Sequence, residues 1–158
     1  MASIILPMKK AAAEKILRGE VKADARRRLT SRVEAGDWVY MYATTPTKKL
    51  LGRFKVSSIH RTVVQELVEK FGDLLGGGVG RSKLASAKDG TEVAILGIES
   101  PMRAEAPTDL RAIDMYPPQE STVLTSFDEL VIKYKMWPSI NWETEGADAS
   151  IDFLMRRI

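Results

Sequence analysis

The sequence predicts an α+β fold: a small mixed β-barrel of five or six strands decorated by helices, with a C-terminal helical extension. Two observations favour it. Short segments with a hydrophobic period of two are separated by turn residues, and a few stretches between them have the helical period. The chain has 158 residues, 44% hydrophobic and 28% charged, which suits one compact unit. We expect a barrel domain at residues 1–122 and an extension at 123–158 packed on it.

The N-terminal segment predicts a strand followed by a helix. Residues 3–6 are apolar, and Pro7 is a favoured first residue of a helix. Gly19 is suited to end that helix after Arg18. The apolar stripe of the helix recurs every four residues and consists of Met8, Ala12 and Ile16, which we interpret as core.

A second strand is predicted over residues 21–28, where the hydrophobic period changes to two. Three consecutive arginines end this segment, and guanidinium groups suit phosphates and base edges. One side of the strand is apolar and the other polar. The apolar side consists of Val21, Ala23 and Ala25, and the polar side of Lys22, Asp24, Arg26 and Arg28.

Two further strands and a polar loop follow a turn at residues 34–37. Residues 38–43 are aromatic and β-favouring, and residues 50–59 alternate in polarity. Between them, residues 44–49 form a polar loop with two lysines. We interpret Trp38 and Tyr40 as core residues.

The middle of the chain predicts a helix, a flexible loop and a strand. Thr62 and Gln65 have the spacing of a capping box for a helix over residues 62–71. The glycine-rich residues 76–80 lack the Gly-Lys-Ser/Thr of a phosphate-binding loop. Residues 93–98 are apolar and predict a strand.

The C-terminal part predicts short elements and then a helix. We expect a helical turn at 108–112, strands at 113–116 and 122–124, and a helix over 127–136 with a capping box at Ser126 and Glu129. Residues 139–152 are acidic and predict a loop. Trp137 and Trp142 are expected to hold this extension on the barrel.

These residues also carry a family resemblance. Gly19, Asp24 and Arg26 match three positions of a Gly-x-Lys-x-x-Glu-x-Arg signature, while Val21 holds the lysine position and Lys22 lies one residue late. Residues 36–54 and the 117–119 run look like later strands of the same family. Over residues 4–121 the chain thus resembles the ASCH domains, relatives of the PUA RNA-binding fold. The resemblance implies a PUA-like barrel.

The resemblance also implies a function, namely binding RNA or a nucleotide-like ligand in a basic cleft. Arginines would neutralise phosphates, and an aromatic ring would stack on an exposed base. Single-stranded or looped RNA is favoured over duplex RNA, and DNA is a weaker option. The expected cleft residues are Lys22, Asp24, Arg26 and Arg28, with Tyr42, Thr44, Thr45, Lys48 and Lys49 opposite.

A small hydrolase is the alternative prediction. Some ASCH proteins are amidohydrolases of modified cytidine, and Lys22, Asp24 and Arg26 would then be catalytic. Lys22 would replace the signature lysine only if a bulge realigned its strand. Ribonuclease activity is the third possibility, with Lys22, Asp24, His60 or Tyr42 as acid-base groups. Nothing in their spacing selects among these four residues.

The composition narrows the kinds of site and of protein to expect. The chain has no cysteine and one histidine, so we expect no metal site and no cofactor. No apolar run has the length of a membrane span, and we expect a cytoplasmic protein. Residues 1–60 hold 13 Lys and Arg against 5 Asp and Glu, although the whole chain carries only +3. This asymmetry would steer anions toward one face.

Overall fold

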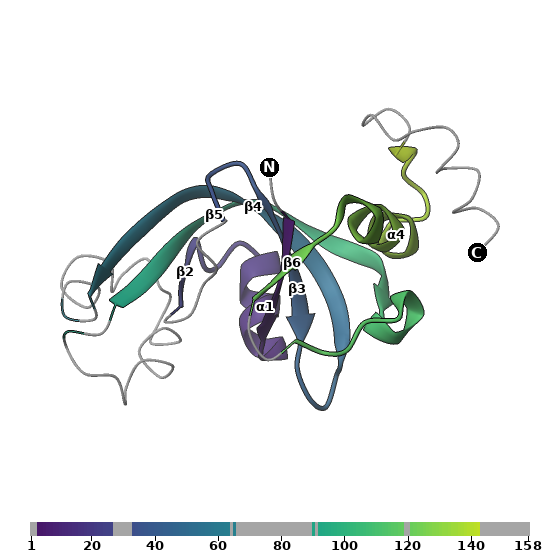
Figure 1. Cartoon of the computed structure of the whole chain (residues 1–158), viewed down its shortest axis with the longest axis horizontal. Helices are drawn as coiled ribbons and strands as arrows, with labels where there is room; N and C mark the ends of the chain where they lie inside the picture. The colour runs from purple at the N-terminus through teal and green to yellow at the C-terminus, as the bar shows by residue number, and fades with distance from the viewer. Residues whose placement is uncertain are drawn as a thin grey trace.

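The computed structural model describes residues 3–26, 33–63, 65, 90, 92–118 and 121–142. This part of the chain forms six strands, two α-helices and one 3-10 helix (Figure 1). The elements are β1 (Ser3–Met8), α1 (Lys10–Leu17), β2 (Ala23–Arg26), β3 (Trp38–Ala43), β4 (Lys49–Val63), β5 (Glu92–Thr108), η1 (Leu110–Ile113), β6 (Thr122–Leu124) and α4 (Ser126–Met136).

The strands form one mixed sheet in the order β2-β5-β4-β3-β1-β6. β1 pairs with β3 in parallel, and the other pairs are antiparallel. The structure confirms the predicted α+β class and the predicted five or six strands. The barrel itself is not closed, because the edge strands β2 and β6 do not pair with each other in the described residues. The β4–β5 ladder contains three register shifts, which bend a sheet but do not join its edges.

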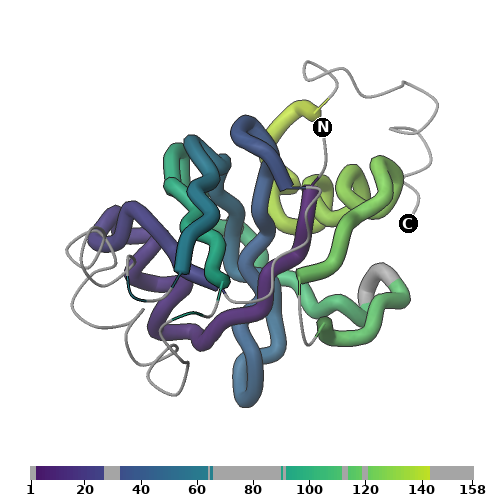
Figure 2. Tube along the Cα trace, turned by 60° about the vertical axis from the view of Figure 1, so that its left-hand side comes forward, coloured from purple at the N-terminus to yellow at the C-terminus, as the bar shows by residue number. Residues whose placement is uncertain are grey.

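Alternation along the strands builds two cores, one on each face of the sheet. The first, which we call the α1 face, contains Ala13 and Ile16 of α1 with alternate residues of β1 and β3. The second, the α4 face, contains Ile132 and Met136 of α4 with the intervening residues. Figure 2 shows the two helices on different sides of the central strands.

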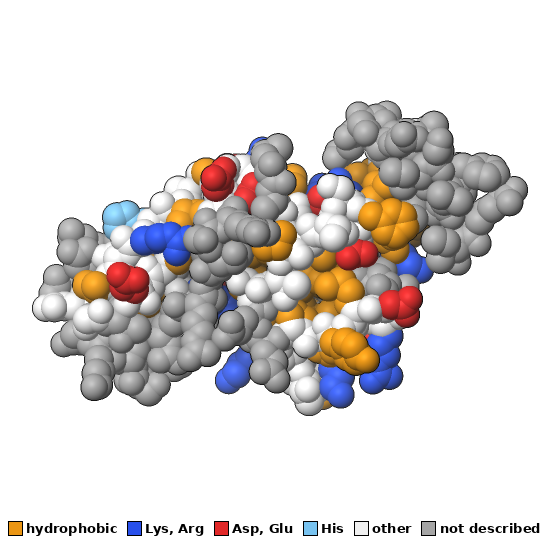
Figure 3. Space-filling view, viewed as in Figure 1, with side chains coloured by type: hydrophobic (Ala, Val, Ile, Leu, Met, Phe, Trp, Pro, Cys, Tyr) orange, Lys and Arg blue, Asp and Glu red, His pale blue; other side chains and the backbone are white. Residues whose placement is uncertain are grey.

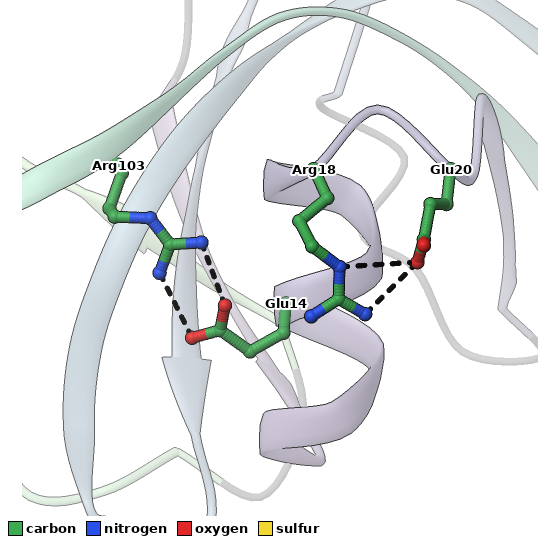
Figure 4. A network of polar contacts seen from close by, with 4 residues as sticks. All are labelled: Glu14, Arg18, Glu20 and Arg103. Atoms are coloured by element: carbon green, nitrogen blue, oxygen red, sulfur yellow. Dashed lines mark hydrogen bonds and ion pairs between the residues drawn. The ribbon is translucent and has the colours of Figure 1, made fainter.

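Close approach fixes α1 against the long strands. A Cβ on Gly52 would lie 2.4 Å from the carbonyl oxygen of Met102 and 2.9 Å from Cδ2 of Leu17. On the same helix, Glu14 accepts two hydrogen bonds from Arg103 of β5, at 2.7 and 3.0 Å (Figure 4). The hydrogen bond from the Arg103 guanidinium lowers the pKa of the Glu14 carboxyl. Gly52 and the Glu14–Arg103 ion pair together fix the position of α1 on the sheet.

A buried arginine organises the α4 face. Arg53 is 2% exposed, and its guanidinium carbon lies 3.7 Å from the ring centre of Trp38. The rings of Trp137 and Trp142 lie 5.3 and 5.2 Å from the same carbon, so the three tryptophans form a cation–π cage. Tyr40 accepts from Arg53 at 3.4 Å and donates to Glu129 at 2.8 Å.

Burial confirms the core role predicted for the aromatic residues. Tyr40 is fully buried, Trp137 and Trp142 are 1% exposed, and Trp38 packs against the same cluster. Burial is the main cause that raises the pKa of the Tyr40 hydroxyl well above its usual value. Trp137 donates its ring N–H to the carbonyl of Arg103 at 2.7 Å, which joins the end of α4 to β5.

The first helix begins later than predicted. Pro7 and Met8 are strand residues, and α1 begins at Lys10. The parallel ladder with β3 continues to the Met8–Ala43 pair and holds these residues extended. β6 pairs only with residues 3–5, so the missing N–H of Pro7 breaks no ladder on that side.

Several later elements also differ from prediction. β5 runs over 17 residues instead of six, because its register shifts let it follow the bent β4. The helical turn is η1, and residues 114–118 are not a strand. The N-cap of α4 is Thr125, whose hydroxyl accepts from the N–H of Asp128, whereas Ser126 is already helical.

Some predictions lie largely outside the described residues. Thr62 belongs to β4, and the rest of the predicted 62–71 helix is described only at residues 63 and 65. The glycine loop at 76–80 and the acidic residues after 142 lie outside the described part. Among the helices that the structure describes, none is long and apolar enough to cross a membrane.

Candidate nucleic-acid interface

Arg26 and Asp24 form a tight ion pair on the edge strand β2. Nε of Arg26 donates to Oδ2 of Asp24 at 2.7 Å, and NH1 donates to the carbonyl oxygen of Pro7 at 2.8 Å. The remaining nitrogen, NH2, is buried and has no hydrogen-bond partner among the described residues. The guanidinium is therefore held in a fixed direction with one donor unused.

The position of Arg26 follows from the open sheet. β2 pairs only with β5, and Pro7 lies at the end of β1, which is separated from β2 in the sheet order by β5, β4 and β3. Arg26 thus reaches across the gap between β2 and β1 with a side chain where a closed barrel would have a ladder. We call Arg26, Asp24 and the Pro7 carbonyl the Arg26 site.

The loop between β3 and β4 (residues 44–48) reaches the same end of β1. The N–H of Thr44 donates to the carbonyl of Met8 at 2.9 Å, one residue beyond the carbonyl bound by Arg26. Thr45 and Lys48 are exposed in the loop, as is Lys49 at the start of β4. Arg26 and the β3–β4 loop thus bind consecutive carbonyls at the end of β1.

Three cations not predicted for the site lie near it. Lys9 and Lys10 follow Met8 directly and are both exposed. Arg61 of β4 pairs with Ala94 of β5, and Ala94 pairs with Arg26, so both arginines lie in one row across the sheet. The Lys-Lys pair was visible in the sequence, but only the strand register could reveal Arg61.

Tyr42 does not lie opposite Arg26. It is 2% exposed and packs in the α4-face core. Burial raises the pKa of its hydroxyl, and Asp109 nearby adds to that effect. Stacking on a ligand base needs an open ring face, and Tyr42 has none. The alternation of β3 explains this, since Met41 and Ala43 take the α1 face.

Lys22 and Val21, the residue at the signature lysine position, lie in different environments. Val21, at the place of the signature lysine, is 8% exposed and belongs to the α1-face core. Lys22 is exposed and precedes β2, whose ladder with β5 runs without a register shift. No bulge in this ladder turns Lys22 into the position of Val21. Arg28 lies outside the described residues.

The remaining candidate, His60, lies on the opposite side of the β4 strand from Arg61 and is exposed. It pairs with Ile95, whose other neighbour is Ala25, so its row differs from that of Arg26. In the described part of the chain, no three His, Asp or Glu side chains gather as a metal site would require.

Comparison with known proteins rests on structure. No family model matches the sequence, and no curated protein matches it. A variant of the ASCH protein from Zymomonas mobilis superposes with a TM-score of 0.72 at 17% identity, covering 82% of this chain and 93% of that one. The unmodified protein gives 0.70 at 17% identity, covering 81% and 91%.

A more distant structural similarity is also found. A protein from Rhodopseudomonas palustris superposes with a TM-score of 0.55 at 9% identity, covering 89% of this chain and 97% of that one. At such identities the similarity concerns the fold. The mixed sheet, the position of α1 and these superpositions lead to one conclusion: the chain has the ASCH-type fold.

Proposed function

We propose that the protein binds RNA or a nucleotide-like ligand at the Arg26 site. The observation that carries the proposal is the buried NH2 of Arg26, which has no hydrogen-bond partner among the described residues. A buried donor left unpaired costs about 1–3 kcal/mol. A phosphate or base oxygen would supply the missing acceptor, and Asp24 and Pro7 already hold the guanidinium in place.

The surroundings favour a polyanion over a small neutral ligand. Lys9, Lys10, Lys48 and Lys49 are exposed beside the end of β1, and each offers a flexible ammonium to a phosphate backbone. Such contacts make affinity depend on salt without reading sequence. Arg26, in contrast, is oriented and would select one group of the ligand.

The hydrolase alternative has less support from this geometry. Asp24 is only 8% exposed and is hydrogen-bonded to Arg26, which is the arrangement of an orienting carboxylate. The signature position holds the buried Val21, so the described residues place no lysine there. A binding function needs no such group.

The test is fluorescence anisotropy with labelled single-stranded RNA, hairpin RNA and duplex DNA at two salt concentrations, followed by a gel to check the RNA. We expect salt-sensitive RNA binding that Arg26→Ala weakens at least about tenfold. Arg18→Ala is the matched control, because Arg18 is exposed at the far end of α1 and pairs with Glu20 at 3.0 Å (Figure 4).

Two outcomes would contradict the proposal. Absence of RNA binding by the unmodified protein would remove it outright. An equal loss of RNA affinity in Arg26→Ala and Arg18→Ala would show that only the net charge of the protein matters. Cleaved RNA on the gel would instead support the hydrolase alternative.

A further inference from the structure

Tyr116 is the most exposed large hydrophobic side chain of the described residues. It is 92% exposed, and the only other large hydrophobic side chain exposed in this part is Phe127 at 50%. An aromatic ring this open makes almost no contact with its own protein, so its surface is available to a partner.

The backbone presents this ring on a fixed support. The N–H of Met115 donates to the carbonyl of Leu110 at 3.0 Å, and Met115 packs against the α4-face core. Pro117 and Pro118 follow, and proline fixes its own φ while restricting the residue before it. With one neighbour packed inward and the other rigid, Tyr116 is directed outward at little cost in entropy on binding.

Charges of both signs lie around this segment, and its cations are Arg111 and the lysines of the neighbouring β3–β4 loop. Arg111 of η1 is exposed, and both Asp109 and Arg111 act on the pKa of Tyr42, the residue two before the β3–β4 loop, with Asp109 having the larger effect. Leu50, after Lys49, pairs with Thr108, which places the start of β4 beside the residue that precedes η1. Asp109 and Asp114 are exposed acids of the same segment, and the Asp109 carboxylate accepts from the N–H of Arg111.

The figures agree with this neighbourhood. In Figures 1 and 2, η1 and the β3–β4 loop lie toward the same lower end of the molecule. In Figure 3, Lys and Arg side chains gather at the lower right beside exposed hydrophobic side chains. An exposed aromatic ring among cations is the arrangement that binds unstacked bases.

We propose that Tyr116 is a stacking platform for one unpaired base of a single-stranded nucleic acid, with Arg111, Lys48 and Lys49 contacting its flanking phosphates. The inference rests on the proposed function and extends it. The strand would run from the Arg26 site past the β3–β4 loop to Tyr116. Tyr116 thereby takes the stacking role for which the buried Tyr42 has no open face.

The experiment measures binding of single-stranded RNA that contains 2-aminopurine, a base whose fluorescence falls on stacking. Tyr116→Ala should weaken binding about tenfold and abolish the fall in fluorescence, while the salt dependence stays unchanged because no charge is removed. Tyr116→Phe keeps the ring and should bind within about twofold of the unmodified protein.

Phe127→Ala is the matched control, because it also removes an exposed ring but one beside Asp128 and Glu129. It should leave affinity unchanged. Normal affinity of Tyr116→Ala alongside weak binding by Arg26→Ala would overturn this inference alone and leave Tyr116 as a candidate protein contact. Absence of RNA binding by the unmodified protein would overturn the proposed function, and this inference with it.

Discussion

The sheet holds two largely buried arginines, Arg53 and Arg26, whose environments differ in kind. On the α4 face, three tryptophans enclose Arg53, which is 2% exposed. On the edge strand β2, Arg26 is 15% exposed in its side chain and is held by a carboxylate and a carbonyl. Each guanidinium has one buried nitrogen without a hydrogen-bond partner among the described residues, Nε of Arg53 and NH2 of Arg26, but only Arg53 is enclosed by aromatic rings.

The difference separates stability from binding. Cation–π contacts stabilise a guanidinium without an acceptor, and they compensate for the buried Nε of Arg53, which has no hydrogen-bond partner among the described residues. An ion pair and one backbone carbonyl satisfy only part of the five donors of Arg26. We therefore expect substitutions on the α4 face to change stability and those around Arg26 to change ligand affinity.

The largest expected effect is that of Arg53→Ala on stability. The substitution empties a cage of three tryptophans and removes the donor to Tyr40, so the free energy of unfolding should fall by about 3 kcal/mol. Urea denaturation followed by far-UV circular dichroism measures it. Arg53→Lys, which keeps the charge but not the planar fork, should fall in between.

The proposed contrast between Arg53 and Arg26 would be wrong if Arg26→Ala proved as destabilising as Arg53→Ala in the same denaturation experiment. We expect a smaller loss of about 1–2 kcal/mol for Arg26→Ala, because its ion pair, although largely buried, lies on an edge strand and its removal empties no aromatic cage. A loss for Arg53→Ala below that value would mean that the cage contributes little.

Gly52→Ala tests the α1 face and should have an intermediate effect. The added Cβ would meet the backbone oxygen of Met102 at 2.4 Å, which cannot move aside as a flexible side chain would. We expect a loss of about 2 kcal/mol and weaker RNA binding, since α1 leads directly from the Arg26 site. Thermal unfolding and anisotropy measure the two effects.

Gly90→Ala is the control for this prediction. A Cβ on Gly90 would meet nothing within 4 Å, so stability should change by less than about 0.5 kcal/mol. If Gly52→Ala behaves like Gly90→Ala, α1 is not held by close approach to β4 and β5.

The smallest expected effect is the pH dependence from Glu14. The hydrogen bond from Arg103 lowers its folded-state pKa below the ordinary 4.5. Its contribution is thus present above pH 4.5 and is lost as the pH falls through the folded value. Arg103 is half exposed, so we expect less than about 1 kcal/mol at pH 7.

Glu14→Gln should remove this dependence. The difference in unfolding free energy between the unmodified protein and the variant should shrink between pH 6 and pH 3. A constant difference over that range would show that the carboxylate charge is not what Arg103 binds.

Local patterns predicted the α+β class and several strands, because alternation and turn residues are properties of a short segment. The core role of Tyr40 followed from the aromatic and β-favouring character of its strand. The open sheet and the length of β5 did not, since register shifts depend on the partner strand. Tyr42 was misplaced because alternation does not say which face a ligand uses.

The candidate site shows the same limit. The sequence placed Asp24 and Arg26 on the same side of one strand, because residues two apart on a strand share a face. It did not predict that Arg26 binds the carbonyl of Pro7, 19 residues earlier in the chain. Arg61 entered the same row only through the pairing of β4 with β5.

The tryptophan cage around Arg53 also determines which events intrinsic tryptophan fluorescence can report in this protein. The chain has three tryptophans, and all of them surround Arg53. Intrinsic tryptophan emission is therefore a local signal for the docking of α4 and its following residues on the sheet. A ligand at the Arg26 site should leave that emission nearly unchanged, so an unaltered spectrum on adding RNA would say nothing against binding.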